Sequence, residues 1–87
     1  MKKVGHNIMD NIDHQVRVII ERIYKKKHAD PIMLNLSTSL RNDLGFDSLD
    51  LAELTVKIED IFDVDIFENR IVDTLQEIEK EIENARN

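Results

Sequence analysis

Hydrophobic residues recur along this chain at intervals of three and four, the spacing that places side chains on one face of an α-helix. The clearest run predicts a helix over residues 7–27, whose apolar face consists of Ile8, Ile12, Val16, Ile19, Ile20 and Ile23. Lys25, Lys26, Lys27 and His28 crowd its end, where positive charge suits the helix dipole. Alternation with a period of two, which is typical of β-strands, is nearly absent, so the pattern indicates an all-α fold.

Residues 48–62 predict a second helix with two different faces. Its core face is expected to consist of Leu51, Leu54, Ile58, Ile61 and Phe62, which fall within a stripe about 100° wide. The opposite face mixes apolar and acidic side chains, namely Leu49, Ala52, Val56, Glu53, Glu59 and Asp60. Scattered exposed apolar residues are normal on proteins, but this mixture would also suit a docking face for a basic partner.

The remaining segments are predicted from turn and capping signals. The connection over residues 29–47 is not simply polar, because Ile32, Leu34, Leu36, Leu40, Leu44 and Phe46 recur through it. We expect it to pack against the helices, with Gly45 at a positive φ just before the second helix. Residues 67–72 predict one short helical turn. The last helix is predicted to begin at Thr74-Leu75-Gln76-Glu77, a Thr-x-x-Glu capping box.

Composition narrows the class of protein. With 87 residues the chain has room for one domain, which we take as residues 1–87. Its longest uninterrupted apolar runs are three residues, far short of the ~20 that a membrane-spanning helix needs, so we expect an intracellular, cytoplasmic protein. A net charge of −6 disfavours binding to nucleic acid or anionic membranes and favours basic surfaces of other proteins. The absence of cysteine excludes thiolate nucleophiles and disulfides.

Ser48 is the candidate residue for chemistry. The sequence Phe46-Asp47-Ser48-Leu49-Asp50 lacks the glycines of a nucleophile elbow, and carboxylates beside the hydroxyl would oppose an alkoxide. The three histidines have no metal-ligand spacing and no sequence link to the serine, so we expect neither an enzyme nor a metal site. Two roles stay open: Asp47 or Ser48 caps the second helix, or Ser48 is a hydroxyl that another enzyme modifies. Capping alone is not expected to explain aspartates on both sides of the serine.

The stretch DLGFDSLDLAEL, residues 43–54, resembles the attachment motif of acyl carrier proteins, Asp-Leu-Gly-x-Asp-Ser-Leu-Asp-x-x-Glu-Leu. Nine of its twelve positions match. The stretch KIEDIFDVDIFE, residues 57–68, and the order of the expected helices extend the resemblance over nearly the whole chain. The resemblance implies a four-helix bundle of the acyl-carrier type, with a long first loop and a short third helix.

The same resemblance implies a role for individual residues. Ser48 would receive a 4′-phosphopantetheine arm from coenzyme A through a holo-acyl-carrier-protein synthase, and the arm would carry acyl groups as thioesters. Basic acyl-processing enzymes would read a docking face formed by Asp47, Leu49, Asp50, Glu53, Val56, Glu59 and Asp60. An apolar interior for the acyl chain would be lined by Leu51, Leu54, Ile58, Phe62, Ile71 and Leu75. We expect a monomer that works in fatty acid biosynthesis.

Departures from the family pattern leave alternatives open. Phe67 stands where proline is usual, Ile61 replaces a common glutamate, and Lys57 and Arg70 add positive charge. These changes leave the attachment chemistry intact but bear on which enzymes dock and which acyl group is carried. One alternative is a specialised carrier for a polyketide, aminoacyl or other acyl group. The other is an unmodified helical adaptor that binds partners through the second helix.

Overall fold

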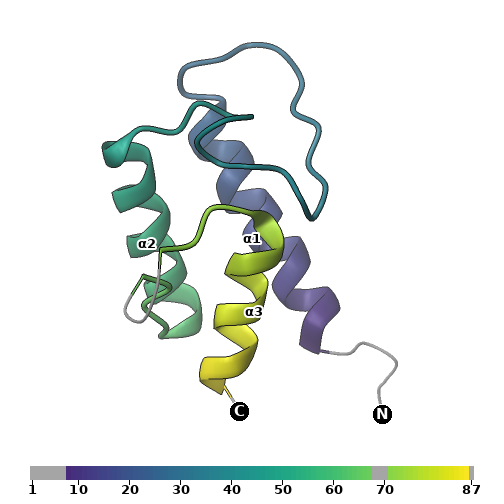
Figure 1. The fold of residues 1–87 in the computed structure, drawn as a ribbon, viewed down its shortest axis with the longest axis vertical. Coiled ribbons are helices and arrows are strands. Elements are labelled where there is room, and N and C mark those ends of the chain that lie inside the picture. Colours follow the sequence, from purple (N-terminus) through teal and green to yellow (C-terminus); the bar gives the residue numbers. More distant parts are fainter. Residues whose placement is uncertain (1–7, 68–70, 87) are drawn as a thin grey trace.

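The computed structural model describes residues 8–67 and 71–86, and over these residues the chain forms three α-helices and no strand. The helices are α1 (Ile8–Tyr24), α2 (Ser48–Phe62) and α3 (Leu75–Arg86), which confirms the all-α prediction. α1 packs against both other helices and runs antiparallel to them (Figure 1). The end of α1 and the start of α2 therefore lie at the same end of the bundle. Of the short helical turn predicted over residues 67–72, residues 68–70 lie outside the described part, and Phe67, Ile71 and Val72 belong to no helix.

One hydrophobic core joins the three helices. From α1 it takes the predicted face, Ile12, Val16, Ile19, Ile20 and Ile23, while the side chain of Ile8 lies outside the described part. α2 contributes Leu54, Ile58 and Phe62, and α3 contributes Leu75, Ile78 and Ile82. Burying a side chain of this size stabilises a fold by about 1.5–3 kcal/mol, so these shared faces hold the short helices together.

Ile61 does not belong to the core face of α2, contrary to the prediction. Its side chain is 48% exposed, whereas Ile58 is fully buried. The buried stripe of α2 follows Leu54, Ile58 and Phe62 at steps of four, and Ile61 lies at the margin of that stripe. The sequence pattern gave the direction of the apolar face correctly but overestimated the width that the neighbouring helices cover.

Ile71 was expected to line the interior, and this prediction is also wrong. It is 77% exposed, while Val72 beside it is fully buried. An antiparallel bridge between Ser39 and Thr74 holds this segment against the connection that precedes α2. In an extended segment successive side chains point to opposite sides, so only one of the two neighbours can face the core.

The connection between α1 and α2 packs against the bundle, as its apolar residues predict. Leu40, Leu44 and Phe46 are buried, although Leu36 is 46% exposed and was wrongly expected to pack. The backbone N–H of Leu40 donates to the carbonyl of Asp73 at 2.8 Å. This contact ties the connection to the residues just before α3 and so supports the start of α2.

The predicted capping box of α3 is confirmed. The hydroxyl of Thr74 accepts a hydrogen bond from the backbone N–H of Glu77 at 3.2 Å. In return, Oε1 of Glu77 accepts from the backbone N–H of Thr74 at 3.1 Å. Two backbone donors that the helix itself leaves unpaired are thereby satisfied.

Candidate functional site

The start of α2 is built around a reciprocal capping box of two aspartates. Asp47 is the N-cap, and its Oδ1 accepts a hydrogen bond from the backbone N–H of Asp50 at 2.9 Å. Oδ2 of Asp50 accepts from the backbone N–H of Asp47 at 3.1 Å. Gly45, with φ of 71° as predicted, turns the chain into this cap. Capping therefore explains both aspartates, and the expectation that it would not is wrong.

Ser48 is the first residue of α2, and its hydroxyl has no structural task. The residue is exposed, and its Oγ makes no hydrogen bond to any residue that the structure describes. Asp47 has taken the capping role that the sequence left open between these two neighbours. The N-terminal end of a helix, where backbone N–H groups and the dipole favour negative charge, suits a phosphate attached to this oxygen.

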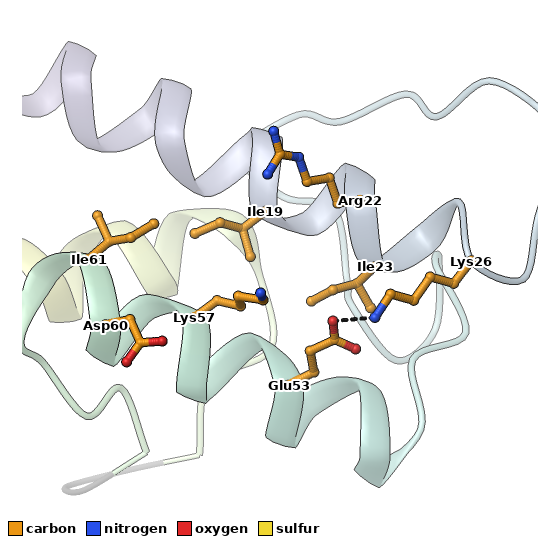
Figure 2. Close-up of a pocket in the computed structure, with 8 residues that line it drawn as sticks. All are labelled: Ile19, Arg22, Ile23, Lys26, Glu53, Lys57, Asp60 and Ile61. Atoms are coloured by element: carbon orange, nitrogen blue, oxygen red, sulfur yellow. Dashed lines mark hydrogen bonds and ion pairs between the residues drawn. The ribbon is translucent and has the colours of Figure 1, made fainter.

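Two lysines that follow α1 reach the acids at the start of α2. Nζ of Lys27 lies 3.0 Å from Oδ2 of Asp47 and 3.1 Å from Oδ2 of Asp50. Lys26 pairs with the carboxylate of Glu53 (Figure 2). From the sequence, these lysines were expected to interact only with the dipole of the helix that they follow. These pairs join residues 20 to 27 positions apart, so local pattern gave no signal for them.

The same contacts shift the ionisation of the groups beside Ser48. The backbone N–H of Asp50, and then the ammonium of Lys27, hold the pKa of Asp47 at about 2. The hydrogen bond to Asp47, followed by that to Asp50, raises the pKa of Lys27. At neutral pH the carboxylate of Asp47 is therefore ionised and already paired with a cation, and it is a poor base for the proton of the serine.

Most of the outward face of α2 is open to solvent, as predicted. Leu49 and Val56 are 78% and 55% exposed. Glu59 and Asp60, which follow them toward the end of the helix, are exposed as well. Two acids are less open. Asp50 is 8% exposed because the capping box and Lys27 cover it, and Glu53, which pairs with Lys26, is half-buried. The exposed part of this face combines apolar and acidic groups, which suits contact with a protein that carries positive charge.

The residues expected to line an acyl chain are closely packed. Leu54, Ile58 and Leu75 are fully buried, Phe62 is nearly so, and Leu51 is half-buried. A groove of about 400 Å³ lies elsewhere, between α1 and α2. Figure 2 shows the residues that line it: Ile19, Arg22, Ile23, Lys26, Glu53, Lys57, Asp60 and Ile61. None of the six residues expected to surround the acyl chain lines this groove.

Three further features of the described part of the chain concern metal sites, histidine contacts and membrane-spanning helices. No three His, Cys, Asp or Glu side chains there are grouped so that they could hold a metal ion. His28 stacks on Tyr24, with ring centroids 4.4 Å apart, and His14 is exposed on α1. No helix within residues 8–67 and 71–86 has the length and apolar character needed to cross a bilayer.

These features define a small helical protein that presents an exposed serine at an acidic helix start. Residues 14–82 match the family model described as a phosphopantetheine attachment site. The chain is 35% identical over 80 residues to acyl carrier protein 3 of Ralstonia nicotianae, covering 90% of this chain and 84% of that protein. It is 33% identical over 79 residues to the acyl carrier protein of Buchnera aphidicola subsp. Schizaphis graminum, and this match covers 91% of this chain and 95% of that protein.

A third relative, the acyl carrier protein of Amoebophilus asiaticus, is 38% identical over 52 residues, and the match covers 60% of this chain and 65% of that protein. No solved structure matches the chain significantly. The family model and the relatives together show that the chain belongs to the acyl carrier protein family. It is accordingly a carrier that works with a phosphopantetheine arm and with acyl-processing enzymes, and not an enzyme itself.

Proposed function

We propose that Ser48 is the residue to which the 4′-phosphopantetheine arm is attached. The observation that supports this most directly is that Ser48 is exposed and its hydroxyl makes no hydrogen bond within residues 8–67 and 71–86, because Asp47 caps the helix in its place. Ser48 also lies within the matched residues 14–82. The arm, when attached, supplies a thiol that holds acyl groups as thioesters. The backbone N–H groups at the start of α2 would face its phosphate.

Attachment needs a second protein. The serine oxygen displaces the adenosine bisphosphate half of coenzyme A and forms a phosphodiester, and its proton has to pass to a base. Asp47 is a poor base, since its pKa is about 2, and the carboxylates of both Asp47 and Asp50 already accept hydrogen bonds in the cap. The base therefore comes from the synthase, and this chain contributes the positioned hydroxyl and the surface that the synthase recognises.

The docking face would be formed by the predicted residues of α2, with Leu49, Val56, Glu59 and Asp60 as its exposed part. Asp50 would act mainly through the cap that positions Ser48. We further propose that the chain is one monomeric cytoplasmic domain of the acyl-carrier type. Fatty acid biosynthesis is the proposed pathway, and a specialised acyl group is the alternative that Lys57 and Ile61 favour.

Intact mass measurement tests the attachment site. The purified chain is incubated with coenzyme A, magnesium and a holo-acyl-carrier-protein synthase, and we expect one phosphopantetheine on the wild type and none on Ser48→Ala. Ser37→Ala, which removes another exposed hydroxyl, is the control and should be modified like the wild type. If several synthases leave the wild type unmodified, the unmodified-adaptor hypothesis is favoured instead. The mass of acyl groups on protein isolated from its source distinguishes fatty acyl cargo from the alternatives.

A further inference from the structure

The acids nearest Ser48 are neutralised by cations of the same chain. Lys27 contacts both Asp47 and Asp50, at 3.0 and 3.1 Å, and Lys26 pairs with Glu53 (Figure 2). We call Asp47, Asp50 and Glu53 the masked acids. Their negative charge is therefore less available to an approaching protein than the sequence suggests.

The acids toward the other end of α2 are not covered in this way. Glu59 and Asp60 are exposed, and neither has an ion-pair partner among the residues that the structure describes. We call these two residues the open acids. The docking face thus has an open part, which attracts a basic protein first, and a masked part beside the residue to be modified.

The masking contacts can be exchanged for contacts with a partner. The side chains of Lys26 and Lys27 are 59% and 50% exposed, and ion pairs at such positions are weak. An arginine of a partner can replace a lysine favourably, because a guanidinium binds a carboxylate through two parallel hydrogen bonds. Displacing Lys27 frees two carboxylates together, so the partner has to supply positive charge to both Asp47 and Asp50.

We propose that Lys26 and Lys27 are specificity-determining residues, which restrict this carrier to partners that present arginines to the start of α2. The two lysines compete with every basic partner for the masked acids. This competition lowers the affinity most for partners that bring only one cation to the start of α2. The inference rests on the proposed function, since it takes Ser48 to be the residue that partners approach. It adds that recognition is set by residues after α1 as well as by α2.

Three substitutions test this competition. Lys26→Gln and Lys27→Gln remove the ion pairs and keep a long polar side chain. Lys25→Gln is the matched control, because it removes the same charge from the adjacent position, where the lysine pairs with Glu21 of its own helix at 3.6 Å. Far-UV circular dichroism checks that all three variants keep the helix content of the wild type.

Two measurements are made on each variant, at low and at high salt. The first is kcat/KM for phosphopantetheine transfer from coenzyme A by a holo-acyl-carrier-protein synthase. The second is the Kd of the unmodified chain for a synthetic helical peptide with arginines along one face. We expect Lys26→Gln and Lys27→Gln to raise kcat/KM and to tighten peptide binding about two- to fivefold at low salt, with smaller gains at high salt.

The control variant distinguishes masking of the acids from a general effect of removing one positive charge. Lys25→Gln should stay close to the wild type, and equal gains in all three variants would overturn the proposal. A lower kcat/KM or weaker peptide binding for Lys26→Gln or Lys27→Gln would also overturn it, because the lysines would then contact the partner themselves. A wild type that no synthase modifies would refute the proposed function alone, since the peptide comparison does not depend on Ser48.

Discussion

Glu79 lies on α3 with only 4% of its surface exposed, facing Asp13 and Arg17 of α1. Burial, and then the hydrogen bond and charge of Asp13, raise the pKa of Glu79 from 4.5 to about 8. The hydrogen bond with Glu79 in turn lowers the pKa of Asp13. Oε2 of Glu79 is buried and accepts no hydrogen bond from the described residues, so an ionised Glu79 would be poorly solvated. At neutral pH the carboxyl group of Glu79 therefore keeps its proton.

The sign of the pH dependence follows from the raised pKa. Above pH 4.5 the unfolded chain releases a proton that the folded protein retains, so the contribution of Glu79 to stability is complete below that pH. It is lost as pH rises toward the folded pKa, at up to about 1.4 kcal/mol per pH unit. Glutamine has the same shape, donates a hydrogen bond toward Asp13 and does not titrate. Glu79→Gln should therefore be about 2–3 kcal/mol more stable than the wild type at pH 7, and within about 1 kcal/mol of it at pH 5.

Urea unfolding followed by far-UV circular dichroism at pH 5, 6 and 7 measures this difference. Glu59→Gln makes the same chemical change at an exposed position of α2 and is the control, which should follow the wild type. The stability of the wild type should fall relative to that of Glu79→Gln as pH rises. Parallel pH profiles for the two proteins, or a Glu79→Gln variant less stable than the wild type at pH 7, would refute the reasoning.

Two further predictions concern the start and the packing of α2. Ile58→Ala should lower the free energy of unfolding by about 2–5 kcal/mol because Ile58 is fully buried, whereas Ile61→Ala, at a half-exposed position, should cost less than about 1 kcal/mol. Urea unfolding compares the two variants, and equal losses of unfolding free energy would show that Ile61 packs in the core after all. Gly45→Ala should cost about 1 kcal/mol through its φ of 71° alone, since nothing lies within 4 Å of an added Cβ. A much larger loss in the same assay would contradict this account.

The features predicted correctly are those that depend on residues close together in the chain. The bounds of α2, the capping box of α3 and the positive φ of Gly45 each follow from a few neighbouring residues. The cap of α2 was only half predicted, because an aspartate in place of glutamate three residues after the cap is a weaker form of the capping signal. The burial of Glu79 was not predicted, although the sequence indicates it, since helical spacing places Glu79 on the same face as Leu75 and Ile82.

The sequence by itself determined the helices, their apolar faces and the serine motif, because helical periodicity and capping act over three or four residues. Only the tertiary structure decided which parts of those faces are covered, leaving Ile61 and Ile71 exposed where a neighbouring element does not reach. It also decided that Lys27 meets Asp47 and Asp50, since this contact requires α1 to run antiparallel to α2 and end beside its start. Such contacts depend on how the helices pack, and no spacing within a single helix encodes them.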